Sequence, residues 1–222
     1  MTAEFARTSQ TKMNRKPARG AYDEETIHAI LDDAIFCQVA FIVDGRPFVI
    51  PSNFGRIDNT IYLHGAKASR LMKAIASGEA ICIGVTHLDG LVLARSLFSH
   101  SVNYRSAVLF GHGRLVTELA EQMEALKAVT DQLLPGRWDE ARKPSQKEID
   151  STAIVAFEIE EASAKSRQGG VLDEPEDMEL PVWAGVVEMA QIPMKILPES
   201  GLPESVEIAP SVAKWFGNAV GH

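Results

Sequence analysis

Short β-type segments separated by turn dipeptides recur along the middle of the chain, and they constrain its fold most strongly. Asp44-Gly45 separates one pair of apolar runs, and Asp58-Asn59 and Asp89-Gly90 separate two further pairs. Dipeptides of this kind adopt the backbone angles of tight hairpin turns, so each one predicts a β-hairpin. Many short strands at this spacing favour an antiparallel barrel or sandwich, because a parallel sheet would need a helix between successive strands.

Three other segments have apolar residues at helical spacing. Asp23 is placed to cap a helix over 26–31, and Ser69 to start a second helix that ends at Gly78. The clearest apolar stripe lies between Leu119 and Leu134 and stops at a Pro-Gly pair. The sequence therefore predicts an α+β protein that is mainly β, with peripheral helices.

The 222-residue chain has room for one large domain. Residues 1–20 are polar and basic without periodicity and are expected to form a flexible N-terminal arm. Residues 21–189 carry the strand and helix patterns, and residues 190–222 form a peripheral C-terminal tail. No apolar stretch approaches the ~18 residues that would span a bilayer, and no secretory signal is recognisable. We therefore expect a cytoplasmic protein without membrane contact.

Charge is distributed unevenly along the chain. The formal net charge of −8 at pH 7 disfavours a nucleic-acid-binding protein. Residues 46–114 nevertheless carry eight basic and three acidic side chains, whereas residues 158–207 carry three basic and twelve acidic ones. A positive middle in an acidic chain favours an anionic small molecule as the ligand of that region.

The segment from His64 to Arg70 has the composition of an anion-binding site. Gly65 permits a tight turn, Ser69 is placed at a helix N-cap, and Lys67 and Arg70 add two cations close by. Backbone N–H groups at the start of a helix and nearby cations together bind phosphate. A capped helix with solvated basic residues explains the same pattern, so both interpretations stay open.

Two further groups of polar residues flank predicted strands. They are Ile50, Pro51, Ser52 and Asn53 at a strand end, and Arg95, Ser96, Asn103, Tyr104 and Arg105 between two apolar strands. Turn chemistry and surface polarity account for each group about as well as ligand binding does. No pair of histidines has zinc-motif spacing, and no nucleophile elbow, Walker loop or dinucleotide-binding glycine motif is present. The sequence offers these residues as candidates for ligand binding and leaves the catalytic residues unknown.

Eight motifs in a fixed order along residues 15–187 carry a family resemblance. They are residues 46–51, 62–65, 69–70, 88–96, 103–106, 135–138, 162–167 and 183–185. Together they resemble the flavin-nucleotide-binding proteins related to pyridoxamine 5′-phosphate oxidase.

The resemblance implies an antiparallel split β-barrel that binds FMN at the interface of a two-fold homodimer. It implies that the FMN phosphate lies beside residues 64–70 and that residues 50–53 run along the flavin ring. Arg95, Ser96 and residues 103–106 would line the pocket, and Trp183 would close it from the partner subunit. The implied function is that of an FMN-dependent oxidoreductase acting on a small molecule, with a non-catalytic flavin- or haem-binding carrier as the alternative.

The chain departs from the oxidase after Trp183. Only Lys195 and Lys214 are cationic there, whereas the oxidase carries an arginine-bearing motif that recognises its substrate. This departure disfavours the oxidation of pyridoxamine 5′-phosphate. Binding of haem would require an axial ligand, for which the sequence gives no preference among His64, His87, His100 and His112.

Overall fold

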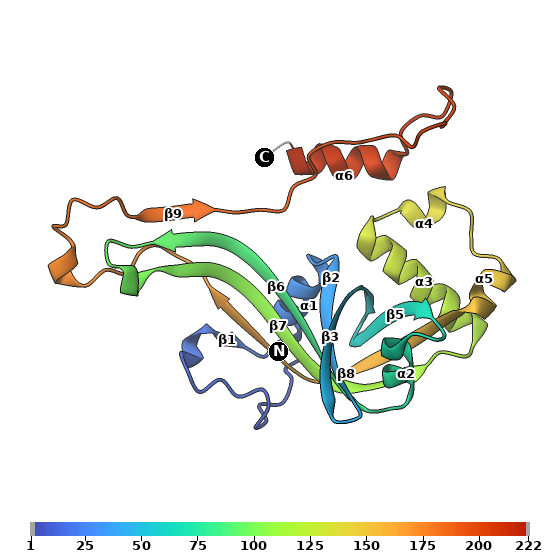
Figure 1. Ribbon diagram of the computed structural model, residues 1–222, viewed down its shortest axis with the longest axis horizontal. Coiled ribbons are helices and arrows are strands. Elements are labelled where there is room, and N and C mark those ends of the chain that lie inside the picture. The colour runs from blue at the N-terminus through green and yellow to red at the C-terminus, as the bar shows by residue number, and fades with distance from the viewer. Residues whose placement is uncertain (1–2, 221–222) are drawn as a thin grey trace.

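One antiparallel sheet forms the centre of the structure, a computed structural model in which residues 3–220 are described (Figure 1). Its strands are β1 (Gly20–Ala21), β2 (Phe36–Val43), β3 (Arg46–Asn53), β4 (Gly55–Ile57), β5 (Thr60–Ala66), β6 (Ala80–Leu93), β7 (Ser101–Leu115), β8 (Thr152–Arg167) and β9 (Gly185–Glu188). They pair in the order β3-β2-β6-β7-β8-β5-β4, with β1 beside β8 and β9 beside β6. The end strands β3 and β4 do not pair with each other, so the sheet is not closed. The predicted α+β class with a split antiparallel barrel is confirmed.

Helices lie around the sheet rather than between successive strands. They are α1 (Glu24–Asp32), α2 (Arg70–Ala76), α3 (Leu119–Leu133), α4 (Arg137–Glu140), α5 (Gln146–Ser151) and α6 (Pro210–Val220). The first three match the predicted helices, and Asp23 caps α1 by accepting a hydrogen bond of 2.8 Å from the Thr26 N–H. The short helices α4 and α5 hold too few residues for a periodic apolar pattern, and α6 lies in the segment expected to be a peripheral tail.

The three turn dipeptides give two confirmed predictions and one wrong one. Asp58-Asn59 connects β4 to β5, where Ile57 pairs with Thr60 and Asp58 has a φ angle of 49°. Asp44 and Gly45 connect β2 to β3 with φ angles of 51° and 73°, as a tight hairpin requires. Asp89-Gly90 is not a turn, because β6 continues through it to Leu93 and only a shift of register marks the position. A Cβ atom on Gly90 would lie 3.0 Å from the Val187 carbonyl oxygen, so this glycine permits the close approach of β9.

The apolar side chains form two cores on opposite sides of β5. The larger core holds Ile61 and Leu63 together with residues of α1, α2 and the other strands. The smaller core joins Tyr62 to Ala125 and Val129 of α3. Successive side chains of a strand point to opposite faces, so β5 separates the barrel interior from the face that α3 covers.

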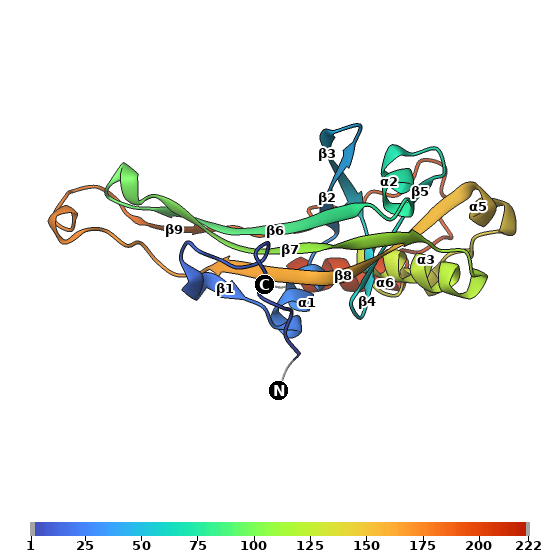
Figure 2. The ribbon, with the colours of Figure 1, turned by 90° about the horizontal axis from the view of Figure 1, so that it is seen from below.

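A long hairpin arm extends from the barrel (Figure 2). It comprises the ends of β6 and β7, the connection over residues 94–100, and β9, which pairs with residues 90–93. After β9 the chain runs without strands or helices to α6, where the Ser211 N–H donates a hydrogen bond of 2.8 Å to Glu140 of α4. Within residues 3–220, no helix is both long and apolar enough to cross a membrane.

The residues before β1 contact the sheet. Phe5 is buried in the larger core, and the Thr8 hydroxyl donates a hydrogen bond to the Glu161 carboxylate of β8. Gly20 and Ala21 then pair with Lys165 and Ala164. The described part of the N-terminal segment therefore packs along β8.

Candidate functional site

The junction between β5 and α2, residues 64–70, directs its side chains to two sides of the molecule. His64 follows Leu63 in β5 and therefore points away from the barrel core, toward α3. Arg70 begins α2 and reaches the edge strand β3, where its guanidinium carbon lies 4.4 Å from the centre of the Phe48 ring. The predicted anion-binding segment therefore borders two different surroundings.

On the β3 side, the junction carries cations that no carboxylate neutralises. Lys67 and Arg70 are exposed, and neither forms an ion pair within 4.0 Å with a described residue. The Ser69 side chain likewise makes no capping hydrogen bond. β3 pairs only with β2, so its other edge is free beside Arg70. This arrangement leaves two positive charges available to an anion next to Ile50, Pro51, Ser52 and Asn53.

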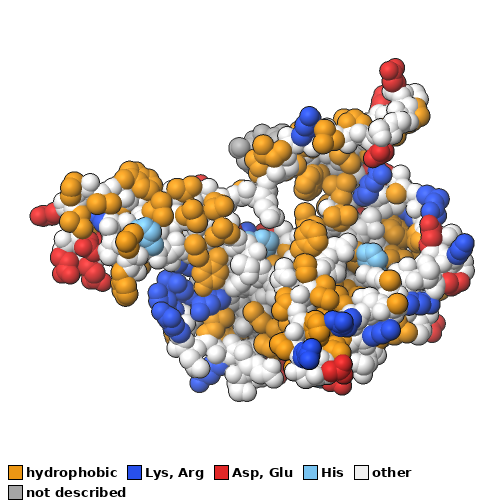
Figure 3. Space-filling model, viewed as in Figure 1, with side chains coloured by type: hydrophobic (Ala, Val, Ile, Leu, Met, Phe, Trp, Pro, Cys, Tyr) orange, Lys and Arg blue, Asp and Glu red, His pale blue; other side chains and the backbone are white. Residues whose placement is uncertain are grey.

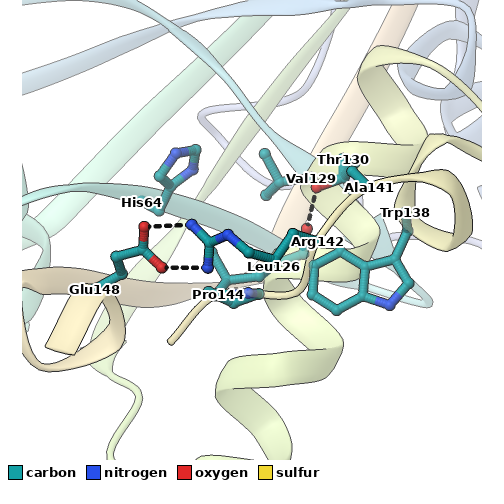
Figure 4. Close-up of a pocket in the computed structure, with 9 residues that line it drawn as sticks. All are labelled: His64, Leu126, Val129, Thr130, Trp138, Ala141, Arg142, Pro144 and Glu148. Carbon is teal, nitrogen blue, oxygen red and sulfur yellow. Dashed lines mark hydrogen bonds and ion pairs between the residues drawn. The ribbon is translucent and has the colours of Figure 1, made fainter. Parts of the chain in front are cut away.

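On the α3 side, His64 lines a cavity of about 300 Å³, which we call the His64 cavity (Figure 4). The lining residues come from β5, α3, α4, α5 and the segment between α4 and α5, and they are His64, Leu126, Val129, Thr130, Trp138, Ala141, Arg142, Pro144 and Glu148. Most of this wall is apolar. The His64 Nδ1 atom is buried without a hydrogen-bond partner, and burial lowers the pKa of the imidazole, which favours its neutral form.

The other described histidines differ from His64 because their ring nitrogens are engaged. His28 bonds Asn59 at 2.7 Å, and His87 bonds the Ile30 carbonyl oxygen at 2.9 Å. His100 contacts the Ser96 carbonyl oxygen at 3.0 Å, and His112 contacts the Glu160 carboxylate at 2.8 Å. Among residues 3–220, His64 is thus the histidine that lines the His64 cavity and has a buried ring nitrogen without a hydrogen-bond partner.

An ion pair borders the mouth of the His64 cavity. The two terminal nitrogens of Arg142 donate to the two carboxylate oxygens of Glu148, at 3.0 and 2.7 Å. Their side chains are 70% and 51% exposed, respectively. The hydrogen bonds from Arg142 and from Ser145 lower the pKa of the Glu148 carboxyl to about 2. The cavity is therefore apolar inside and charged at its rim.

Asn103 and Arg105 lie in a second cavity, of about 530 Å³, beside the hairpin arm. Arg105 is bound to Asp89 at 3.1 Å and to Asp33 at 2.6 Å, and these hydrogen bonds raise its pKa. Asn103 accepts a hydrogen bond from Arg167 and donates one of 3.1 Å to the Gly169 carbonyl oxygen. The polar groups of both residues are therefore already paired within the chain.

Arg95, Ser96 and Trp183 lie at the tip of the arm. The Arg95 guanidinium and backbone N–H both bind Asp173, at 2.8 and 3.0 Å. The Trp183 ring is 66% exposed and covers Gly185, where a Cβ atom would lie only 2.9 Å from the ring. β6 connects the barrel end near α2 to this tip over 14 residues, which corresponds to about 45 Å. One chain therefore does not bring these three residues to the junction.

Most of the lining of the His64 cavity comes from the segment that runs from α3 to α5. The sequence did not indicate that these residues form a cavity with His64. They include Trp138, Arg142 and Glu148. Trp138 belongs to the 135–138 motif, which carried the family resemblance without an assigned role. That motif was the only sequence signal that pointed to this part of the lining.

Comparisons with known proteins agree with the fold. The family model for pyridoxamine 5′-phosphate oxidase matches residues 23–166, which contain the junction and the whole lining of the His64 cavity. The structure of the flavocytochrome Anf3 from Azotobacter vinelandii is 36% identical, with a TM-score of 0.87 over 94% of this chain and 97% of that chain. The FAD and haem binding protein from Mycobacterium smegmatis is 33% identical, with a TM-score of 0.84 over 89% of this chain and 97% of that chain. A search of curated proteins finds no match.

Proposed function

Because this chain belongs to the pyridoxamine 5′-phosphate oxidase family, we propose that it is a redox protein that binds a flavin nucleotide and a haem. The observation that carries the proposal is its similarity, over 94% and 89% of its length, to a flavocytochrome and to an FAD- and haem-binding protein. When bound, the flavin supplies hydride chemistry and the haem supplies one-electron chemistry. The protein's own residues bind these groups, orient them and exclude water.

The flavin phosphate is assigned to the β3 side of the junction. Lys67 and Arg70 supply positive charge that no described carboxylate compensates, which is the property that a phosphate site needs. Ser69 supplies a free hydroxyl at the same place. The flavin ring would then lie along residues 50–53 of β3. FMN is the nucleotide that the resemblance implies, whereas the M. smegmatis relative binds FAD.

A homodimer completes this flavin site in our proposal. Arg95, Ser96 and Trp183 would reach the flavin from the arm of the partner subunit, because one chain holds the arm tip far from the junction. Tyr104 lies farther back on the arm, where it pairs with Leu88 and Arg167. Large apolar side chains on the arm and the tail support a second copy as the partner: Leu97 and Phe98 are 87% and 98% exposed. Figure 3 shows such side chains gathered over the arm on this face. Patches of this kind mark protein interfaces.

The haem is assigned to the His64 cavity. An axial ligand must present a nitrogen lone pair to the iron. His64 lines this mostly apolar cavity, and its imidazole Nδ1 has no hydrogen-bond partner. The donor set and the apolar lining therefore fit a haem. At about 300 Å³ the cavity is at the lower end of cofactor pockets, so part of the group would lie at the open rim beside Arg142 and Glu148.

The proposed activity is that of an oxidoreductase that exchanges electrons with a small molecule, and a flavin or haem carrier is the competing function. Full-length protein is purified, its flavin is released with acid, and chromatography identifies FMN or FAD. Anaerobic titration with NADPH and a panel of substrates then follows flavin and haem absorbance. Reduction and reoxidation by a substrate support the oxidoreductase, whereas cofactors that stay bound and unchanged with every donor support the carrier.

A further inference from the structure

The rim of the His64 cavity holds a single pair of opposite charges. Of the nine lining residues, Arg142 is the one cation and Glu148 is the one anion. The remaining lining is apolar except for the Thr130 hydroxyl and the imidazole of His64. A ligand in this cavity therefore meets charge at one place only, the Arg142–Glu148 ion pair (Figure 4).

Glu148 does not depend on Arg142 for its hydrogen bonds. Its Oε2 atom accepts from the Ser145 N–H at 2.7 Å and from the Ser145 hydroxyl at 2.9 Å, as part of the capping box that begins α5. Arg142 can therefore leave without exposing an unpaired carboxylate. The pair is also largely exposed to solvent, where screening makes such an ion pair weak.

We propose that Arg142 is a ligand-binding residue, which leaves Glu148 and pairs with a carboxylate of the haem held against His64. This inference rests on the proposed haem site and adds how that site selects its ligand. A guanidinium binds a carboxylate through two parallel hydrogen bonds, and the propionates of haem are carboxylates on an otherwise apolar ring. Glu148 competes with the ligand for the same guanidinium, so it weakens binding of carboxylate-bearing ligands.

Two porphyrins that differ in this one feature test the proposal. The cofactor-free full-length protein is titrated with haemin and with haemin dimethyl ester, whose carboxylates are blocked, while the Soret band reports binding. Wild-type protein is expected to bind haemin about tenfold more tightly than the ester, the size of one charge-assisted hydrogen-bond interaction. Arg142→Gln should remove this preference by weakening haemin binding alone.

Two further variants make the result independent of one substitution. Glu148→Gln keeps an acceptor for the capping box and removes the competing charge, so haemin should bind several-fold more tightly and the ester as before. Lys147→Gln, an exposed cation next to Glu148 that does not line the cavity, should leave both affinities unchanged. Circular dichroism of each variant verifies its fold.

The titrations distinguish failure of the proposed role of Arg142 from failure of the proposed haem site. Equal affinities for haemin and its ester in the wild type, or an unchanged preference in Arg142→Gln together with no gain in Glu148→Gln, would overturn the role of Arg142 while the haem site stands. No Soret shift with either porphyrin would overturn the haem site itself, and the role of Arg142 with it.

Discussion

The guanidinium of Arg70 lies 4.4 Å from the ring centre of Phe48, so the first residue of α2 is held against the edge strand β3. The contact joins two segments that the sequence indicated separately as binding candidates. They are the cationic junction and β3, the strand that contains residues 50–53. It holds Arg70 beside β3, which pairs only with β2 among the described residues. In the proposed site, the flavin phosphate and the flavin ring would therefore lie on neighbouring surfaces of one subunit.

Replacement of Arg70 tests that assignment. Arg70→Ala should weaken flavin binding about tenfold or more, because a charge-assisted contact to phosphate is lost. Arg56→Ala is the control, since Arg56 is bound to Asp32 at 2.6 Å and lies outside the assigned site. Flavin fluorescence titration measures both affinities. Equal losses in the two variants would mean that the positive charge acts only as general surface potential.

Replacement of His64 tests the haem site. His64→Ala should abolish or strongly shift the Soret band after reconstitution with haemin, because the imidazole that lines the cavity is removed. His112→Ala should leave the spectrum as in the wild type, because His112 is exposed and bound to Glu160. Flavin content should stay unchanged in both variants. A normal Soret band in His64→Ala would place the axial ligand elsewhere.

Replacement of Gly55 tests the packing of α3 on β4, which supports one wall of the His64 cavity. A Cβ atom on Gly55 would overlap the backbone of Ala128 and Val129, so α3 rests directly on β4 there. Gly55→Ala should lower the free energy of unfolding by about 2 kcal/mol or more. Gly84→Ala in β6 is the matched control, because nothing lies within 4 Å of its added Cβ. Urea denaturation of both variants checks this, and a Gly55→Ala protein as stable as the control would contradict the packing.

The ion pair of Asp173 with Arg95 predicts that the stability of the hairpin arm depends on pH. Burial alone would raise the pKa of the Asp173 carboxyl, but hydrogen bonds from Arg95 outweigh burial and hold the pKa below its usual value. The carboxylate therefore stabilises the arm above its ordinary pKa, and this stabilisation is lost as the pH falls through the lowered value. Hydrogen exchange of residues 168–180, corrected for intrinsic rates, should increase in acid. Asp173→Asn should exchange rapidly already at neutral pH, and protection equal to the wild type would contradict the prediction.

Local signals in the sequence predicted the elements that depend on neighbouring residues. Asp44-Gly45 sets its own backbone angles, and Asp23 bonds an N–H three residues later, so both could be read directly. Asp89-Gly90 has the same local signal, but β9 approaches it from almost 100 residues away in the sequence. Pairing with β9 decides its conformation, and no local pattern reports that pairing.

In the candidate site, too, local residue patterns could be predicted and contacts between distant segments could not. The residue types of the junction indicated an anion site without reference to the fold. The direction of His64 could not be predicted, because it depends on which face of β5 α3 covers. The rest of the His64 cavity is built from residues 126–148, which reach His64 through the packing of α3 on β4 and β5 and through the pairing of β5 with β8.

The absorption spectrum of the full-length protein, reconstituted with flavin and haemin and passed through gel filtration, tests the proposed function most directly. We predict that flavin bands and a Soret band co-elute with the protein and that both cofactors are retained in stoichiometric amounts. A protein that elutes colourless after reconstitution would contradict the account. Flavin bands without a Soret band would contradict the haem site at His64 and leave the flavin site standing.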